Sequence, residues 1–402
     1  MTTHNPIRIL YDHRIFEMQQ YGGVSRYFYE IINEFVQSSD IKPSISIAVS
    51  NNYFINKIDD QYLIPGILNR NTINKLILPD KDYSIFSKIS ANVKNWINYK
   101  KICEYISKNY SNTIENLQNG DFDIFHPTYY DTYFLPYLNG KPFIITVYDI
   151  IHEKYPEFYP LDDKTIYEKK ILIERANHII AISQSTKDDI IRYYNIPQER
   201  ITVIHLGNKV ISDETENKKD NIKSFPKKFL LYVGTRALYK NFYFMVESLA
   251  PLFKKDENLK LVCFGGEEVS KEEKYFIQNL GLKDKIIYLS GTDDLLTSGY
   301  KQAFALIYPS QYEGFGIPII EAFKFGCPVI ASNIPSIVEI GKDAVDYIEP
   351  KDPISIREAV ELLLSNDYYR SELIKKGTLE AEKYSWKKTA QRTAEVYKEN
   401  MI

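Results

Sequence analysis

The sequence predicts an α/β protein made of two domains, each built on a parallel β-sheet. The chain has 402 residues, which is more than one hydrophobic core usually serves, so two domains of similar size are expected. Short apolar runs recur along both halves, and each run is followed by a polar loop and then by a segment with helical periodicity. Hydrophobic residues make up 44% of the chain, which is enough for two well-packed interiors.

The composition argues against several classes of protein. The net charge of −3 gives no reason to expect a nucleic-acid partner. The cysteines, Cys103, Cys263 and Cys327, are odd in number and widely separated, which argues against a disulfide framework and against a zinc site. No charged segment followed by an apolar one opens the chain, and no stretch is long enough to span a bilayer. We therefore expect a cytoplasmic protein, either soluble or attached at the inner face of the cytoplasmic membrane.

The first domain is predicted over residues 1–210. It opens with a strand over 7–11 and a helix over 24–36, joined by a loop that contains Gly22 and Gly23. A strand, paired glycines and a helix are how a Rossmann-like domain presents backbone amides to a phosphate or a sugar. Paired glycines also occur in ordinary turns, so the loop does not identify a site by itself.

Two later strands of this domain end in polar side chains. The strand over 123–126 ends at His126, and the strand over 143–147 is followed by Asp149. Sites form at the carboxyl ends of parallel strands, so both side chains are candidates. A single histidine is more often a structural hydrogen-bonding residue than a catalyst, and this alternative stays open. The domain closes with a strand over 178–182, a helix over 186–194 and a strand over 201–204.

Residues 81–110 form an unusual segment, in which lysines alternate with aromatic and aliphatic residues. If it is helical, it presents a basic face with aromatic edges, a surface suited to anionic lipid. The alternative is a helix packed on the domain with its lysines in solvent. The first interpretation predicts a peripheral contact with the membrane. Its lysines are Lys88, Lys94, Lys100, Lys101 and Lys108.

A charged and polar run over 211–228 predicts the linker between the domains. The second domain is predicted over 229–384 and begins with an apolar strand over 229–233. Arg236 and Lys240 follow this strand and precede a helix. Cations at a helix N-terminus oppose the helix dipole unless an anion lies between them, so these two side chains point to a bound phosphate.

Two further strands, over 259–264 and 286–289, also end in polar loops. Gly291 and Thr292 lie in the second of these loops and are candidates for binding a nucleotide base, although the sequence does not indicate which base. The chain then continues with predicted helices over 354–365, 368–384 and 385–402.

The stretch from Tyr308 to Ser332, which follows an apolar strand over 304–308, combines two carboxylates, a glycine-bracketed turn and a helix that starts with proline. Its glycines let the backbone adopt positive φ and approach a ligand, and Pro318 suits the first position of a helix whose free amides can hold phosphate. Glu313 in the loop and Glu321, expected in the first helical turn, can each accept two sugar hydroxyls. The alternatives are a solvated loop carboxylate and one that only favours the helix N-terminus. The candidate residues are Glu313, Gly314, Phe315, Gly316 and Glu321.

This stretch resembles the E-x7-E signature of retaining glycosyltransferases of family 4. Glu313 and Glu321 are separated by seven residues within EGFGIPIIEA, and GCPVIAS follows. The resemblance extends through QYGGVSRY and GTRALYKN over most of the chain. It implies the GT-B fold, in which two Rossmann-like domains with parallel sheets face a central cleft. It also implies that the last helix, over 385–402, crosses back to the first domain.

The resemblance implies roles for the candidate residues around the donor diphosphate. Gly22 and Gly23 would face the diphosphate from the first domain, and Arg236 and Lys240 would bind it from the second. The backbone of the Gly314-Phe315-Gly316 turn would add amides.

It implies further roles around the two sugars. Glu321 would hold the ribose and Glu313 the hexose of the donor, while His126 and Asp149 would lie under the reacting sugar and near the acceptor. Many relatives have His-Asp where this chain has Tyr148-Asp149, so the role of an imidazole would fall to His126 or to His152 nearby.

No catalytic metal is predicted. Asp121-Phe122-Asp123 superficially resembles the metal-binding DxD of the other large glycosyltransferase fold, but it precedes a strand instead of following one, so we interpret it as a turn.

The expected activity is that of a metal-independent retaining hexosyltransferase without a cofactor. Its co-substrate would be a nucleotide-diphospho-sugar, GDP-mannose-like or UDP-linked, and its acceptor a saccharide or lipid-linked saccharide of a cell-envelope polysaccharide such as O-antigen. One alternative is a glycoside hydrolase that uses Glu313 and Glu321. Another is a nucleotide-sugar-binding subunit without turnover. A dehydrogenase is disfavoured, because Gly22-Gly23 lacks the G-x-G-x-x-G spacing.

Overall fold

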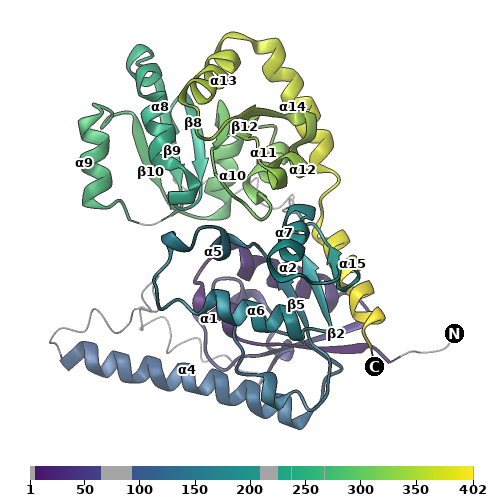
Figure 1. Ribbon diagram of the computed structural model, residues 1–402. Helices are drawn as coiled ribbons and strands as arrows, with labels where there is room; N and C mark the ends of the chain where they lie inside the picture. The colour runs from purple at the N-terminus through teal and green to yellow at the C-terminus, as the bar shows by residue number, and fades with distance from the viewer. Residues whose placement is uncertain (1–4, 65–92, 209–224, 237, 267, 402) are drawn as a thin grey trace. The chain divides into compact units, whose positions relative to one another are not determined.

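The computed structural model describes residues 5–64, 93–208, 225–236, 238–266 and 268–401, and of residues 93–102 only the helical backbone. The chain forms two compact units, which are shown in Figure 1. Each unit is an α/β body with a parallel sheet, so the predicted fold class is confirmed. Unit 1 comprises Met1–Ile182, Thr186–His205 and Trp386–Ile402, and unit 2 comprises Ser183–Ser185 and Leu206–Ser385.

The described strands of unit 1 pair in parallel throughout. They lie in the order β3-β2-β1-β4 and β5-β6-β7, and a bridge between Phe125 and Phe143 joins the two parts. The chain leaves β1 towards β2 on one side and later returns to β4 on the other side. The strands are β1 (Ile7–Tyr11), β2 (Ile41–Ser46), β3 (Leu63–Ile64), β4 (Ile124–His126), β5 (Ile144–Val147), β6 (His178–Ala181) and β7 (Ile201–Val203).

The helices of unit 1 follow its strands, as expected for parallel crossovers. The first residues of α7 cluster with unit 2 and the rest of that helix with unit 1. The helices are α1 (Arg14–Met18), α2 (Gly23–Val36), α4 (Val93–Asn119), α5 (Ile151–Lys154), α6 (Thr165–Arg175), α7 (Gln184–Tyr194) and α15 (Trp386–Glu399).

Helix α15 belongs to the core of unit 1, although it follows all of unit 2 in the sequence. It packs along α2, as Figure 1 shows. Its Trp386 and Tyr397 are almost fully buried. The Tyr397 hydroxyl lies 2.9 Å from the Tyr11 hydroxyl and 2.7 Å from His126 Nδ1. The side chains of α15 therefore complete a polar contact beneath β1 and β4.

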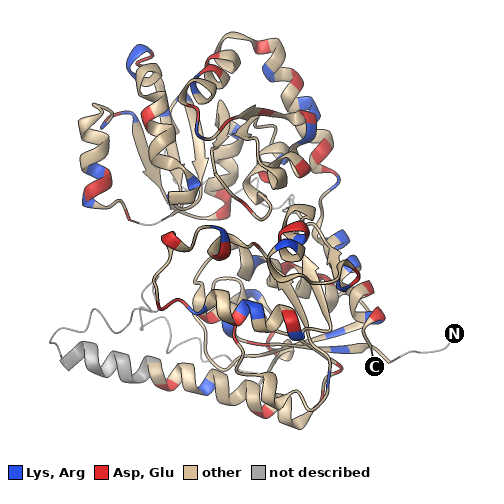
Figure 2. Ribbon diagram, in the orientation of Figure 1, with Lys and Arg blue, Asp and Glu red and all other residues tan. Residues whose placement is uncertain are grey.

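Most of the segment proposed to bind membrane lies outside the described residues, because it covers residues 81–92 and the side chains of 93–102. In the described part of α4, Lys108 is exposed and Asn109 is buried, with Asn109 Oδ1 accepting from the amides of Ala48 and Val49 at 2.9 Å. Figure 2 shows acidic and basic residues alternating along this part of the helix. Among the described helices, none has the combination of length and apolar character that crossing a bilayer requires.

Unit 2 contains a parallel sheet in the order β10-β9-β8-β11-β12-β13. All four residues of β11 are buried, a pattern typical of a parallel strand that helices cover on both faces. The strands are β8 (Lys228–Val233), β9 (Leu259–Phe264), β10 (Ile286–Leu289), β11 (Ala305–Tyr308), β12 (Val329–Ser332) and β13 (Val345–Ile348).

The order of these strands creates a switch point between β8 and β11. From β8 the chain proceeds to β9 and β10 on one side, and from β11 it proceeds to β12 and β13 on the other. Because such crossovers are right-handed, helix α8 after β8 and helix α11 after β11 cover opposite faces of the sheet. Helix α8 packs with α13, and α11 packs with α14. The helices are α8 (Phe242–Lys255), α9 (Lys271–Asn279), α10 (Asp293–Gln302), α11 (Ile317–Lys324), α12 (Pro335–Gly341), α13 (Pro353–Ser365) and α14 (Asp367–Ala381).

Candidate active site

The loops after β8 and β11 meet at the carboxyl edge of the unit 2 sheet. In open α/β sheets ligands bind at this edge, where the order of the strands switches. Here the Lys240 ammonium lies 2.7 Å from Glu313 Oε1, and the Gln311 amide donates to the Tyr239 carbonyl at 2.8 Å. Two residues predicted to bind the donor, Lys240 and Glu313, are therefore in direct contact.

Lys240 lies in a mostly buried, aromatic environment. Its ammonium is 5.2 Å from the centre of the Tyr239 ring and 5.5 Å from that of Tyr308. Burial alone would lower the pKa of this ammonium, but the attraction of the Glu313 carboxylate outweighs burial and holds the pKa well above its usual value. Lys240 is therefore a permanent positive charge at the switch point, with a carboxylate as its partner.

The turn between Glu313 and α11 is built on glycine. Gly316 has φ of 123°, which a side chain rarely tolerates, and it caps the helix that starts at Ile317. The Ser336 hydroxyl donates to the Glu313 carbonyl at 2.7 Å and fixes the turn from the side of α12. Phe315 is 3% exposed and packs edge-on against Tyr384, so its ring serves the core.

Glu321 lies deeper than the sequence suggested. The expected first-turn position is wrong, because α11 begins at Ile317, which makes Pro318 its second residue and Glu321 its fifth. The Glu321 side chain is buried and accepts a hydrogen bond from the Tyr300 hydroxyl at 3.0 Å. Burial, with the carboxylate as a second cause, raises the pKa of the Tyr300 phenol well above its usual value, so the phenol stays protonated as the donor.

Arg236 is held by a different set of groups. Its Nε lies 2.8 Å from Glu273 Oε1, its Nη1 donates to the Gly265 carbonyl at 3.2 Å, and its guanidinium lies 5.2 Å from the centre of the Tyr288 ring. Sequence reasoning did not find Glu273 or Tyr288. The only local signal was the spacing of Ser270 and Glu273, which predicts a helix start but gives no partner for the carboxylate.

The predicted base-binding residues lie at the start of α10. Gly291 and Thr292 are exposed, and the Thr292 hydroxyl accepts from the Leu295 amide at 3.4 Å as the cap of the helix. This contact gives Thr292 a structural role in addition to the predicted one.

The glycine loop of unit 1 leads directly into α2, which starts at Gly23. Gly22 has an extended backbone with φ of −175°, which any residue can adopt. A Cβ at this position would lie 2.2 Å from Gln19 Oε1. That oxygen accepts from the Ser25 amide at 3.2 Å, so Gln19 occupies part of the helix N-terminus.

His126 lies in the interior of unit 1. It has no exposed surface, its Nδ1 contacts the Tyr397 hydroxyl, and its Nε2 contacts the Thr146 hydroxyl at 3.0 Å. Burial lowers the pKa of its imidazole to about 3, so the ring is neutral at physiological pH. The two hydroxyl contacts give His126 a structural role in the interior of unit 1, and its predicted catalytic role stays a prediction.

Asp149 is partly exposed and begins the turn into α5. Its Oδ1 accepts from the Ile151 amide at 3.0 Å, and its carbonyl accepts from the Lys169 ammonium at 3.1 Å. His152, the second histidine considered, stacks on Tyr159 with ring centres 3.8 Å apart. Burial lowers the pKa of His152, so this ring is also biased towards the neutral form.

A polar network at the carboxyl edge of unit 1 was missed by sequence reasoning. Asp12, which follows β1, accepts from the Thr128 hydroxyl at 2.6 Å, and Thr128 follows the neighbouring strand β4. The Arg14 guanidinium lies 3.2 Å from Glu17 Oε2 and 2.9 Å from Asp131 Oδ2. Burial raises the pKa of Glu17 to about 7 despite the nearby guanidinium.

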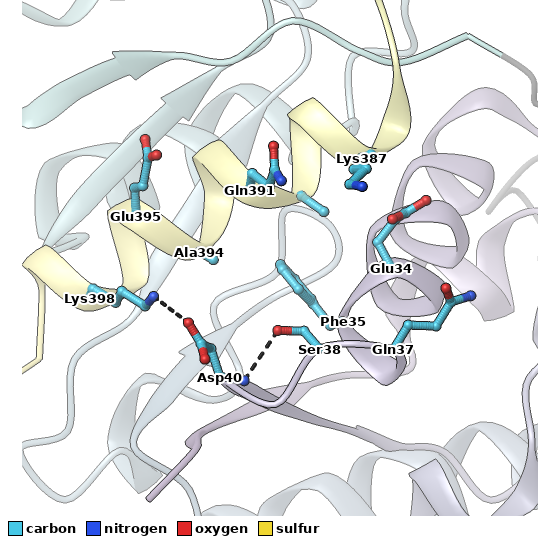
Figure 3. A pocket seen from close by; sticks show the side chains of 11 residues that line it. Glu34, Phe35, Gln37, Ser38, Asp40, Lys387, Gln391, Ala394, Glu395 and Lys398 are labelled. Carbon is cyan, nitrogen blue, oxygen red and sulfur yellow. Dashed lines mark hydrogen bonds and ion pairs between the residues drawn. The ribbon is translucent and has the colours of Figure 1, made fainter. Parts of the chain in front are cut away.

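A groove of about 720 Å³ lies between α2 and α15 in unit 1 (Figure 3). Phe35 and Ala394 line it together with charged side chains, and Asp40 and Lys398 form an ion pair of 2.6 Å beside it. Asp40 precedes β2, so the groove belongs to the amino edge of the sheet. None of the predicted site residues lines it. Among the described residues, no group of three or more His, Cys, Asp or Glu side chains is arranged to hold a metal.

The structure thus brings Lys240 and Glu313 together, and holds Arg236 and Glu321 on separate sets of partners within unit 2. Gly22, Gly23, His126 and Asp149 belong to unit 1.

Comparison with known proteins defines the class to which this fold and site belong. Residues 89–208 match the model of Glycosyltransferase Family 4, and residues 213–380 match that of Glycosyl transferases group 1. A glycosyltransferase from Rickettsia africae superposes with a TM-score of 0.67 over 99% of both chains at 19% identity. WaaG, a glycosyltransferase involved in lipopolysaccharide biosynthesis, superposes with a TM-score of 0.66 over 97% of this chain and 99% of its own at 16% identity. The protein is a glycosyltransferase with the GT-B fold.

The sequence relatives of the chain are also named as glycosyltransferases. The O-antigen chain mannosyltransferase RfbU of Salmonella typhimurium is 33% identical over 219 residues, which are 54% of this chain and 59% of that protein. The O-antigen chain mannosyltransferase B of Escherichia coli is 28% identical over 268 residues, 63% of this chain and 70% of its own. An uncharacterized glycosyltransferase of Methanocaldococcus jannaschii is 27% identical over 69% of this chain and 75% of its own. The chain belongs to glycosyltransferase family 4.

Proposed function

We propose that the protein is a retaining hexosyltransferase that moves a sugar from a nucleotide-diphospho-sugar to a saccharide acceptor during cell-envelope polysaccharide synthesis. The contact between Lys240 and Glu313 at the switch point carries this proposal, because a cation and a carboxylate lie together at the sheet edge where open α/β proteins bind their ligands. Relatives named as O-antigen mannosyltransferases support a mannose-like donor and a polysaccharide acceptor. A neighbouring structure that contains UDP and glucose supports a nucleotide-sugar.

In the proposed reaction the bond between the anomeric carbon and the diphosphate oxygen breaks, and an acceptor hydroxyl oxygen takes its place on the same face. The acceptor's proton passes to the leaving phosphate, so no nucleophile from the protein is needed. The barrier is then set largely by the negative charge that develops on the diphosphate. Lys240, Arg236 and the amides at the starts of α2 and α11 would stabilise this charge without a metal or a cofactor.

In this proposal the carboxylates of Glu313 and Glu321 bind the sugars of the donor. Glu313 would accept hydrogen bonds from the donor hexose, and Glu321 would act at the ribose. Asp149, which is partly exposed, is proposed to orient the acceptor, and His126 to support it from the interior. Gly291 and Thr292, exposed at the start of α10, remain proposed contacts of the base.

The Lys240→Ala variant tests the proposal. We expect the initial rate of sugar transfer to fall about 10²- to 10³-fold, the loss typical when one preorganised electrostatic contact is removed. The matched control is Lys255→Ala, because Lys255 is exposed at the far end of α8. A panel of GDP-, UDP- and dTDP-sugars in a thermal-shift assay identifies the donor beforehand.

Three outcomes would contradict the proposal. If Lys240→Ala transferred sugar at an undiminished rate, the positive charge of Lys240 would have no part in the mechanism. If a chelator abolished transfer and manganese restored it, the reaction would depend on a metal, which contradicts the metal-free scheme. Tight donor binding without transfer to any saccharide would support a subunit without turnover.

A further inference from the structure

Arg236 contacts the Glu273 carboxylate, the Gly265 carbonyl and the Tyr288 ring, and we call these groups the arginine cage. Glu273 holds Nε at 2.8 Å, Gly265 accepts from Nη1 at 3.2 Å, and the ring lies 5.2 Å from the guanidinium carbon. The side chains of Arg236 and Glu273 are 5% and 4% exposed. The guanidinium is therefore restrained along two edges and on one face.

The cage is assembled from neighbouring elements of the sheet. Arg236 follows β8, Gly265 follows the adjacent β9, Tyr288 lies on β10 next to that, and Glu273 lies on α9. Gly266 makes room for the guanidinium, because a Cβ at this position would come within 2.8 Å of Arg236 Nη1 and of the Gly234 carbonyl. The loops that follow these strands therefore leave a space that fits the Arg236 guanidinium.

Glu273 has an unusual partner for its position. It is the third residue of α9, where a glutamate after a serine cap ordinarily returns to the backbone of the cap. The Ser270 hydroxyl does accept from the Glu273 amide at 3.0 Å, but the Glu273 carboxylate reaches Arg236, 37 residues earlier in the chain. Helix formation alone does not require this contact.

We propose that Glu273 is a positioning residue for the donor diphosphate, acting through Arg236 without touching the donor. The inference rests on the proposed function, in which Arg236 binds the diphosphate. A guanidinium recognises phosphate through a planar fork, so the direction of that plane decides which oxygens it meets. Holding the plane before the donor arrives reduces the conformational entropy lost on binding.

A double-mutant cycle on nucleoside diphosphate binding tests this inference. UDP and GDP are titrated calorimetrically into the full-length wild type, Arg236→Ala, Glu273→Ala and the double variant, and the tighter nucleotide is used throughout. We expect Glu273→Ala to raise Kd about tenfold, the order seen when a group that orients a ligand-binding residue is lost. In the Arg236→Ala background the same substitution should change Kd less than about twofold, because its effect passes through Arg236.

Two further variants distinguish an effect of Glu273 on the orientation of Arg236 from effects on protein stability and on charge. Glu273→Gln keeps an acceptor for Arg236 Nε and should recover most of the binding. Glu272→Ala is the matched control, because Glu272 precedes Glu273 on the same turn and is exposed. With donor and acceptor varied separately, Glu273→Ala should raise the KM for the donor and leave the KM for the acceptor unchanged.

Removing one member of a buried ion pair can destabilise a protein strongly. If Glu273→Ala does not fold, Tyr288→Leu supplies the test, because it removes the ring against the guanidinium and keeps the ion pair. It should also weaken binding in the wild-type background and have no further effect in Arg236→Ala.

Unchanged or tighter binding by a folded Glu273→Ala would overturn the inference, since Glu273 would then only neutralise Arg236. An equal effect with and without Arg236 would also overturn it. If Arg236→Ala itself leaves Kd unchanged, Arg236 is not a donor ligand and the inference fails with it. The proposed function then still stands if Lys240→Ala weakens binding, and it fails if Lys240→Ala does not.

Discussion

The carboxyl group of Glu17 has a pKa of about 7, because burial outweighs the attraction of the Arg14 guanidinium. The folded protein therefore binds a proton at this site between about pH 4.5 and 7 that the unfolded chain releases. The free energy of unfolding falls as pH rises through this window, because the folded state must then hold a buried negative charge. The same burial lowers the pKa of the adjacent His13 well below its ordinary value, so His13 supplies no compensating positive charge.

Glu17→Gln should remove this dependence on pH. We expect the variant to gain up to about 3 kcal/mol relative to the wild type between pH 5 and pH 8, since one pKa unit corresponds to about 1.4 kcal/mol. Trp386 is buried in unit 1, and neither of the two tryptophans of the chain belongs to unit 2, so urea unfolding followed by fluorescence reports on the unit that contains Glu17. Glu168, whose pKa is also about 7, contributes equally to both proteins and cancels in the difference. Glu104→Gln, at an exposed position, is the control, and parallel pH profiles of wild type and Glu17→Gln would contradict the prediction.

At the scale of single residues, local pattern and strand order predicted some contacts and missed others. Lys240 and Glu313 could be expected near one another, since each follows a buried strand and such strand ends share one edge of a sheet. The burial of His126 could not be expected, because its partner Tyr397 lies 271 residues away. The pairing of Arg236 with Glu273 could not be expected either, because it depends on the order of β8, β9 and β10 in the sheet and not on spacing in the chain.

The turn that starts α11 depends on one backbone conformation. Gly316 has φ of 123°, and a Cβ there would lie 3.0 Å from Ile340 Cδ1 and 3.4 Å from Ile319 Cδ1. An alanine would therefore have to change the backbone or move the packed side chains. Since the turn also carries Glu313, a shift would reach the contact with Lys240.

Gly316→Ala should lower the free energy of unfolding of unit 2 by about 1–3 kcal/mol, the cost of a residue held in a sparsely populated backbone region. Gly281→Ala is a matched control in the same unit. Gly281 also has positive φ, of 72°, but its Cβ would meet only the flexible end of Lys254 at 3.9 Å. Because unit 2 contains no tryptophan, far-UV circular dichroism during denaturant unfolding measures both variants. Equal losses in the two variants would show that packing around Gly316 contributes nothing.

The strands and helices were predicted more accurately from the sequence than the positions of individual side chains on them. Apolar runs such as Ala305–Tyr308 identified strands because parallel strands buried on both faces are apolar throughout. The start of α11 was misplaced by one residue, which moved Glu321 out of the first turn. Proline is suited to both of the first two helical positions, so its presence does not determine the exact start.

At the scale of the whole molecule, unit 2 is inserted into the sequence of unit 1. Trp386–Ile402 clusters with unit 1 after the chain has completed Leu206–Ser385 in unit 2. The sequence alone placed a linker over 211–228, but residues 211–224 of it lie outside the description. The place of α15 could be expected only by resemblance, because its amphipathic pattern does not say which unit covers it.

This arrangement predicts different behaviour for two fragments. Residues 206–385 contain every strand of the unit 2 sheet and should unfold cooperatively on their own. Residues 1–205 lack Trp386 and Tyr397, which fill the unit 1 interior, and should lack a cooperative transition until a peptide of residues 386–400 is added. Thermal unfolding by circular dichroism, with and without the peptide, makes the comparison, and a peptide with Trp386→Ala is the control. Cooperative unfolding of 1–205 alone at the wild-type temperature would contradict the prediction.

The return of α15 also sets an order of events on the ribosome. Domains usually fold as they emerge, the amino-terminal one first. Here the amino-terminal sheet must wait, with Tyr11 and His126 lacking their hydroxyl partner, until some 180 later residues have been translated. The nascent chain should therefore complete the folding of unit 2 before that of unit 1, and a chaperone that assists its synthesis should be needed at the amino-terminal segment, which is made first.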